Sequence, residues 1–204
     1  MVHQARVIGS PAQRMSTLVN RLGRAVHCLQ FAEGLNPAQW EALRYLTRAN
    51  RYSRTPSALA DYLGTTKGTA SQTIKALEAK GMVARERVVE DGRAVRLTLT
   101  QAGLDILARD PLQRMDQVAA TLAGDLPAAN QTLQTLVNQL QATFGLREFG
   151  LCNECTHFCK NATEGAKPAA AAPADAANGP HQCGLNKDPL SDKDSHQICA
   201  NFRS

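Results

Sequence analysis

Two short helical patterns and a following hairpin pattern, over residues 55–99, constrain the fold of this chain most strongly. The first helix has Thr55 as its cap and Pro56 at its first position, then apolar residues at helical spacing. Gly64 ends it, since glycine adopts positive φ at little cost. A second helix is expected over 66–80. Two helices joined by a tight turn predict a helix-turn-helix, whose second helix enters the major groove of DNA.

The second helix is expected to separate an apolar face from a polar face. Ala70, Ile74 and Leu77 point to a core. The polar positions carry side chains that bind phosphate or base edges: lysine meets phosphate or guanine, glutamine pairs with adenine, and hydroxyls bind either. We therefore expect this part of the chain to contact DNA through Thr65, Thr66, Lys67, Thr69, Ser71, Gln72 and Lys75.

The residues after this helix change from a helical to an alternating period. Residues 82–89 and 94–99 favour strands, and Asp91-Gly92 between them is a hairpin turn signal. Arg93 at the tip suits a narrow, electronegative minor groove. A hairpin directly after a recognition helix is a wing. The expected fold is mainly α with a small β-hairpin wing: a winged helix-turn-helix domain, a helical dimerisation platform and a small metal-stabilised tail.

Helical patterns also flank this domain. Residues 11–34 carry an apolar stripe, and Asn36 starts a helix in which Trp40 is expected to anchor the core. A further helix is expected over 100–122, and a last one over 126–144 with an apolar face and almost no charge. Such a face suits a subunit interface better than a free surface.

These pieces, in this order, resemble the MarR family of transcriptional regulators. The resemblance covers about residues 11–147 and rests on 55–63, Thr66-Lys67-Gly68-Thr69, Leu77-Glu78-Ala79-Lys80-Gly81, Asp91-Gly92-Arg93 and 97–103. It implies an obligate homodimer that binds a pseudo-palindromic operator in double-stranded DNA, usually as a repressor released by a ligand or by oxidation. It also implies that residues 1–34 and 101–149 form the dimerisation platform around a DNA-binding domain at 35–100, with recognition helices roughly 34 Å apart.

The charge of the chain agrees with a nucleic-acid partner. The net charge is +5, and residues 51–96 hold nine basic against five acidic side chains. Residues 50–54 form a polar connection whose two arginines suit either phosphate or plain surface. The sequence has no leader-like or membrane-spanning apolar run, which indicates a cytoplasmic protein with reduced cysteines. Six cysteines in such a chain indicate metal or redox chemistry rather than disulfides.

The cysteines gather in residues 150–204. A Cys-x2-Cys-x3-Cys run is followed by an Ala/Pro-rich stretch at 161–180, expected to be a flexible insert, and by two later His/Cys pairs. Cysteines three positions apart grip one metal from a single turn, and two distant thiolates complete a four-ligand shell. The preferred ligands are Cys152, Cys155, Cys183 and Cys199; Cys159 is a candidate extra thiol, and His181 or His157 a candidate substitute.

The type of metal stays open at this point. Irregular spacing and a spare thiol favour an iron–sulfur cluster slightly, whereas Cys183-Gly184 resembles half of a zinc knuckle. Thiol switching without a metal is a third reading. The leading hypothesis is that this tail couples a redox, iron or metal signal to operator affinity. Because the tail follows the last platform helix, loss of the metal is expected to alter the spacing of two winged domains.

Three other functions remain as alternatives. In the first, the tail is a structural zinc site and the effector is a small aromatic ligand. In the second, the winged helix binds a protein instead of DNA. In the third, the chain is an electron-transfer or metal-dependent enzyme. The last is disfavoured because the core shows no nucleophile–base pair, no glycine-rich phosphate loop and no carboxylate pair at useful spacing. No enzymatic activity is therefore expected.

Overall fold

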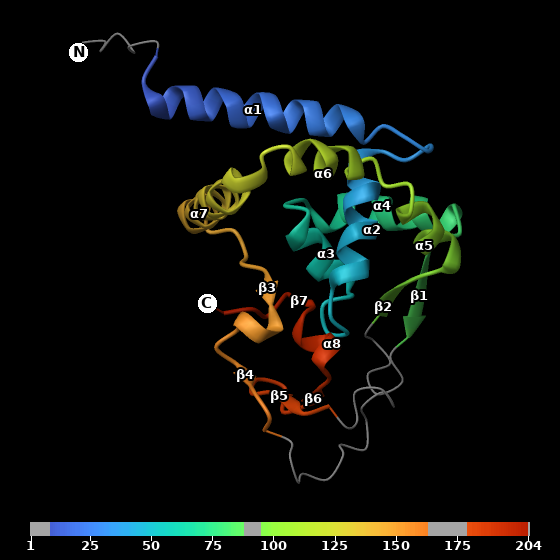
Figure 1. Ribbon diagram of the computed structural model, residues 1–204. Helices are drawn as coiled ribbons and strands as arrows, with labels where there is room; N and C mark the ends of the chain where they lie inside the picture. The colour runs from blue at the N-terminus through green and yellow to red at the C-terminus, as the bar shows by residue number, and fades with distance from the viewer. Residues whose placement is uncertain (1–8, 88–94, 163–178, 204) are drawn as a thin grey trace, which may run out of the picture.

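The computed structural model describes residues 9–87, 95–162 and 179–203. It has three parts: the helices α1 (Pro11–Leu29), α6 (Gln113–Ala120) and α7 (Leu126–Phe144), the winged domain and the cysteine-rich tail (Figure 1). Helix α1 lies across one end, above α6 and α7. The winged domain follows beneath them, and the cysteine-rich tail lies at the opposite end from α1. Among the described residues, no helix combines the length and the apolar character needed to cross a bilayer.

The winged domain has the element order expected from the sequence. It consists of α2 (Pro37–Arg48), α3 (Pro56–Tyr62), α4 (Lys67–Ala79), β1 (Val83–Arg87), β2 (Val95–Leu99) and α5 (Gln101–Leu107). Strands β1 and β2 are antiparallel, with Val83 opposite Leu99 and Arg87 opposite Val95. The mainly α fold with a small hairpin wing is thus confirmed. The expected wing tip, including Asp91, Gly92 and Arg93, lies outside the described residues.

Local capping sets the helix starts of this domain. The side chains of Asn36, Thr55 and Thr66 each accept a hydrogen bond from the backbone amide three residues ahead. Each bond satisfies an amide that the helix itself leaves unpaired, which stabilises the helix by about 1 kcal/mol. Because the caps depend on neighbouring residues alone, the sequence predicted all three starts correctly.

The core of the molecule lies between the helices of the winged domain and the base of the wing. Trp40 is fully buried, and Ala70, Ile74 and Leu77 form the buried face of α4, as expected. Burying each large aliphatic or aromatic side chain stabilises the fold by about 1.5–3 kcal/mol. The same core cluster includes Ile198 and Ala200 from the tail. The tail is therefore packed into the winged domain.

Two expected helices differ from those found. The helix expected over 100–122 is wrong: α5 ends at Leu107 and α6 begins at Gln113. Pro111 accounts for the break, since it lacks an amide hydrogen and disfavours a helical conformation at Asp110. The helix expected over 11–34 ends at Leu29, and Glu33 and Gly34 both have positive φ.

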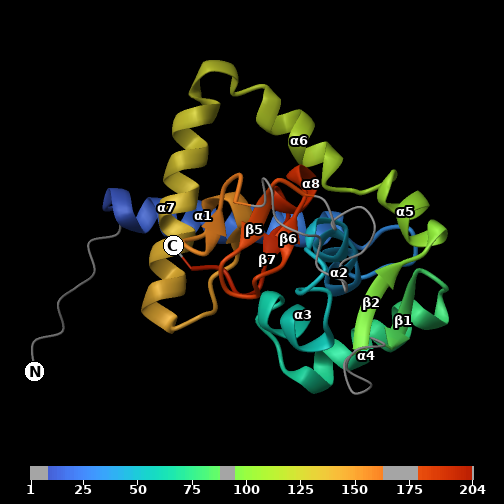
Figure 2. The same cartoon turned by 90° about the horizontal axis from the view of Figure 1, so that it is seen from below.

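The tail is built from very short elements. These are β3 (Gly150–Leu151), the 3-10 turn η2 (Cys152–Glu154), β4 (Phe158–Cys159), β5 (His181–Cys183), β6 (Pro189–Leu190), α8 (Asp192–Ser195) and β7 (Ile198–Cys199). Outside the tail, another 3-10 turn, η1 (Ala123–Asp125), precedes α7. Strand β3 pairs with β7, and β4, β5 and β6 form a three-stranded sheet. In the view of Figure 2, the tail strands lie between α7 and the helices α2 and α3.

Candidate DNA-binding surface and cysteine site

The exposed face of α4 carries most of the residues expected to contact DNA. The side chains of Thr66, Lys67, Thr69, Gln72 and Lys75 are exposed, while those of Thr65 and Ser71 are half-buried. The first turn of α4 contains no acidic residue. The partial positive charge of the helix N-terminus is therefore left available to an anion such as a phosphate.

Two of these residues also hold the start of α4. The Thr66 hydroxyl accepts a hydrogen bond of 3.1 Å from the Thr69 amide and lies 3.0 Å from the Thr69 hydroxyl. These hydroxyls thus fix the first turn before they meet any partner. Lys67, Gln72 and Lys75 carry the long, exposed polar groups that reach away from the helix.

The wing is joined to α4 and to the segment before α3. Arg85 on β1 forms an ion pair of 3.0 Å with Glu78 at the end of α4. The amide of Leu97 on β2 donates a 2.7 Å hydrogen bond to the carbonyl of Arg54, just before the Thr55 cap. The recognition helix, the wing and the start of α3 therefore form one connected unit.

The four cysteines preferred as ligands line one small cavity in the tail. Its volume is about 20 Å³, and it is lined by Cys152, Cys155, Cys183 and Cys199 together with His157, Phe158, Leu185, Asn186, Leu190 and Asn201. Cys152 and Cys199 are buried, and Cys155 and Cys183 are half-buried. Residues from both sides of the Ala/Pro-rich stretch thus come together in one site.

Short turns place these thiols. The amide of Cys155 donates to the Cys152 carbonyl at 3.1 Å, so both thiols come from one 3-10 turn. On the other side, the Lys187 amide donates to the Cys183 carbonyl at 2.7 Å, which closes a second turn. Cys199 lies on β7, which pairs with β3 next to Cys152.

The two buried thiols share a hydrogen bond. This bond raises the pKa of Cys152, and burial raises that pKa further. The same bond lowers the pKa of Cys199 to about 6, against the effect of burial. Further donors reach both sulfurs: the Asn50 side-chain amide lies 3.3 Å from the Cys152 sulfur, and the Asn201 backbone amide 3.3 Å from the Cys199 sulfur. Donors of this kind stabilise the thiolate form that binds metals.

The other candidate ligands lie differently. Cys159 is exposed, and its sulfur is 3.9 Å from the His157 carbonyl. His181 is buried; its Nδ1 accepts a bond from the Asn161 amide at 3.2 Å, and its Nε2 lies 2.9 Å from Asp192. Both nitrogens of His181 are thus engaged in the tail's own structure, and neither Cys159 nor His181 lines the cavity. His157 does line it.

The thiols surround the cavity but do not converge on one point. Within the described parts of the chain, no three Cys, His, Asp or Glu side chains are grouped closely enough to hold a metal ion. A tetrahedral zinc with Zn–S bonds of about 2.3 Å requires sulfurs about 3.8 Å apart. The donor set therefore fits a metal centre in its chemistry, and binding an ion requires these side chains to move closer together.

Sequence reasoning missed two residues of this site, Asn50 and Ser53. Both are buried, and both belong to the connection between α2 and α3. An asparagine followed three residues later by a serine is a local turn signal. The arginine between them, Arg51, donates to the Pro189 carbonyl at 2.6 Å and so faces the tail.

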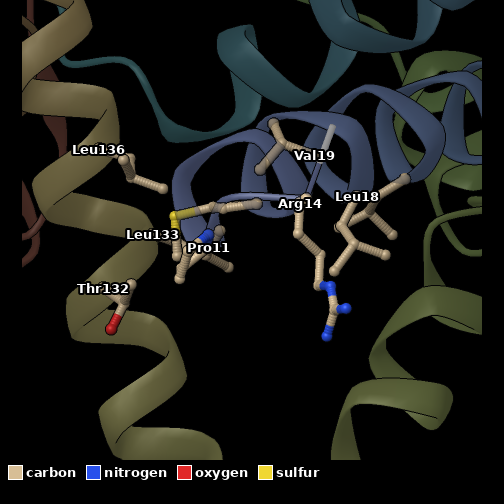
Figure 3. A pocket seen from close by; sticks show the side chains of 10 residues that line it. Pro11, Arg14, Leu18, Val19, Thr132, Leu133 and Leu136 are labelled. Carbon is tan, nitrogen blue, oxygen red and sulfur yellow. The ribbon is translucent and has the colours of Figure 1, made fainter. Parts of the chain in front are cut away.

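A groove of about 700 Å³ lies between α1 and α7 (Figure 3). Leu18 and Val19 from α1 and Leu133 and Leu136 from α7 line it, with Arg14 at its edge. Across α1, α6 and α7 no residue is buried, although all three helices carry large apolar side chains. This apolar face is left uncovered by the chain itself.

Known proteins with a similar sequence or structure support the winged helix-turn-helix fold. Residues 33–94 match the MarR family, and no curated protein matches the sequence. FabT of Streptococcus pneumoniae in complex with DNA is similar with a TM-score of 0.56 and 22% identity, covering 65% of this chain and 99% of FabT. A MarR/EmrR family transcriptional regulator from Acinetobacter sp. ADP1 gives a TM-score of 0.54, 19% identity and coverage of 67% and 99%.

The DNA complex of S. aureus MepR is similar with a TM-score of 0.51 and 17% identity, covering 66% of this chain and 96% of MepR. At such identities the likeness shows the fold. About a third of this chain lies outside each of these three alignments.

Proposed function

Because residues 33–94 match the MarR family, we propose that this chain is a dimeric, sequence-specific repressor of transcription. Its affinity for a pseudo-palindromic operator is modulated by a redox, iron or metal signal at the C-terminal cysteine site. The family match and the structural neighbours are transcriptional regulators, so the proposal includes no enzymatic step. The carrying observation is the exposed polar face of α4, which the Arg85–Glu78 ion pair joins to the wing.

Each polar residue of α4 has a role in this proposal. Lys67 and Lys75 neutralise phosphates or meet guanine, and Gln72 pairs with adenine in the major groove. The hydroxyls of Thr65, Thr66, Thr69 and Ser71 bind phosphate or base edges. Arg93, beyond the described residues, is proposed to enter the minor groove.

The uncovered face of α1, α6 and α7 supports the dimer. Among its side chains, Leu18 is 55% exposed, Leu133 45% and Phe144 70%. Apolar patches of this extent mark protein interfaces. A second copy of the same helices supplies the missing cover, and a two-fold axis through this platform points both recognition helices at one duplex.

The cysteine cavity supports the metal part of the proposal. Four thiols from two separated segments face one space, with backbone and side-chain donors aimed at two of the sulfurs. The irregular spacing of the cysteines in the sequence and the extra thiol of Cys159 favour an iron–sulfur cluster slightly over zinc. Cys152, Cys155, Cys183 and Cys199 would hold it, and it would supply sensitivity to oxidation or to iron supply.

The first experiment is to purify the full chain without oxygen, record its visible absorption and measure iron, sulfide and zinc. A brown protein with iron and sulfide that bleaches in air is expected. A colourless protein with one zinc per chain would indicate that the tail is a structural zinc site and that the effector is a small molecule.

DNA recognition is tested with a duplex selected from a random-sequence library by the wild-type protein. Arg93→Ala is expected to weaken binding to all sequences, whereas Gln72→Ala is expected to relax the preference at one base position. Unchanged affinity and unchanged preference in both variants would contradict this docking.

A further inference from the structure

We infer that the turn at residues 50–53 couples the cysteine site to the helix-turn-helix within one subunit, with Asn50 as the positioning residue. This inference rests on the proposed function and names the route by which the signal reaches the DNA-binding surface. It differs from the expectation that the signal acts through the spacing of the two winged domains.

The side chain of Asn50 has one defined orientation. It is 1% exposed, and its Oδ1 accepts three hydrogen bonds: from the Tyr52 amide at 3.1 Å, the Ser53 amide at 3.0 Å and the Ser53 hydroxyl at 2.7 Å. Three donors at one end of an amide identify that end as the oxygen. The NH₂ group is therefore the end that faces the Cys152 sulfur at 3.3 Å.

The same turn holds both neighbours of Cys199. The backbone amide of Asn50 donates a hydrogen bond to the Ile198 carbonyl at 2.9 Å, and the backbone amide of Ala200 donates one to the Ser53 hydroxyl at 2.8 Å. Ser53 is 1% exposed, so these bonds are shielded from water. A shift of the Cys199 sulfur, as metal binding or loss requires, is thus imposed on residues 50–53.

The turn is bonded in three directions within the winged domain. The Tyr45 hydroxyl on α2 donates to the Ser53 carbonyl at 2.7 Å. The next carbonyl, that of Arg54, accepts from Leu97 in the wing at 2.7 Å, and Thr55 then caps α3. Because a packed interior transmits displacement instead of absorbing it, movement of this turn changes the relation of α3 and α4 to the wing.

The segment between α7 and the tail is itself bonded to the winged domain. Arg147 donates to Asp61 on α3 at 2.6 Å and to Asn201 at 3.2 Å. Among the described residues, hydrogen bonds therefore join the tail and the segment leading into it to α3 and to the 50–53 turn. This arrangement favours a route within the subunit.

The test compares the metal-loaded and the chelator-stripped full chain on the duplex selected from a random-sequence library. Asn50→Asp keeps an oxygen for the three donors of the turn but places an oxygen against the Cys152 sulfur. Ser53→Ala keeps the Asn50–sulfur contact and removes the bond to Ala200. Asn153→Ala is the matched control, because Asn153 is exposed next to Cys152 and its side-chain amide contacts His196 within the tail.

The wild-type protein is expected to show an affinity ratio of about 5–150-fold between its two forms. Asn50→Asp and Ser53→Ala are each expected to reduce this ratio to about twofold or less, while Asn153→Ala keeps it. In iron-loaded protein, Asn50→Asp is also expected to make the reduction potential more negative, since an N–H···S bond is lost. A purely structural role would not move that potential.

Equal affinities for the two wild-type forms would overturn the proposed function itself. A wild-type ratio that Asn50→Asp and Ser53→Ala both retain would overturn only the coupling. Should a variant fail to fold or to hold metal, hydrogen exchange of the wild-type protein decides: stripping the metal is expected to speed exchange at the Ser53 and Leu97 amides. Faster exchange confined to α1 and α7 would place the signal in the platform and overturn the inference.

Discussion

Arg44 on α2 donates two hydrogen bonds of 2.7 Å each to the carboxylate of Asp110, which lies in the connection between α5 and α6. Their side chains are 12% and 15% exposed. The pair joins the winged domain to the start of the platform at the point where Pro111 breaks the helix. Burial raises the pKa of Asp110, but the bonds from Arg44 and from the Leu112 amide outweigh this effect and hold the pKa below its usual value.

Replacing Arg44 is expected to reduce stability strongly. Arg44→Met leaves the Asp110 carboxylate half-buried without its partner, which costs about 3 kcal/mol at neutral pH. Urea unfolding followed by circular dichroism at a fixed protein concentration measures the loss. Arg109→Gln is the matched control; it removes an exposed pair with Glu33 and is expected to change stability by at most about 1 kcal/mol.

The same pair predicts a dependence on pH. Since the pKa of folded Asp110 lies below that of the unfolded chain, its contribution is present above about pH 4 and is lost as the pH falls through the folded value. The stability difference between wild type and Arg44→Met is therefore expected to shrink in acid. A difference that stays constant from neutral pH to strong acid would contradict the role of this carboxylate.

Lys75→Ala is expected to weaken binding to all duplexes and to lower the salt dependence of binding by about one counterion, because a phosphate contact carries no sequence information. Fluorescence anisotropy over a series of salt concentrations measures both. Lys193→Ala, at an exposed position on α8, serves as the control and should leave the slope unchanged. An identical slope in Lys75→Ala would remove this residue from the docking surface.

Leu133→Glu is expected to break the dimer, since it places a charge in the apolar groove between α1 and α7. Analytical ultracentrifugation should then give a particle of one 22.0 kDa chain. Leu104→Glu changes a residue of similar exposure on α5, outside the groove between α1 and α7, and should leave the dimer intact. Dimerisation of Leu133→Glu with wild-type affinity would place the interface elsewhere.

Cys183→Ser is expected to abolish metal retention, whereas Cys159→Ser is expected to keep it. Cys183 lines the thiol cavity and is only half-buried, so the chain tolerates the change; Cys159 is exposed and outside the cavity. Metal analysis after anaerobic purification separates the two variants. If Cys159→Ser alone lost the metal, the ligand set proposed here would be wrong.

The features predicted from the sequence were those that depend on near neighbours. The Thr66 cap, the apolar face of α4 around Ile74 and the two strands of the wing each follow from a few consecutive residues. The break at Pro111 was equally local, and it was missed because apolar residues continue at helical spacing on both sides of the proline.

The site was harder to predict, because its parts meet only through folding. Cys152 and Cys183 were grouped by residue type, and the structure places both at one cavity. Nothing near Asn50 in the sequence indicates a thiol, since its partner lies 102 positions further along the chain. Long-range contacts of this kind depend on the pairing of β7 with β3. Strands of two residues leave no recognisable pattern in the sequence, so this pairing could not be predicted.

The position of Ile198 and Ala200 in the central core has a consequence for biosynthesis. The ribosome makes the helices and the wing of the winged domain first, and it adds these two core residues only after the platform and most of the tail. A nascent chain that has reached α7 therefore still exposes part of its apolar core to water. Completion of the DNA-binding domain waits for the segment that carries Cys199, so maturation of the cysteine site and the last step of folding coincide in time.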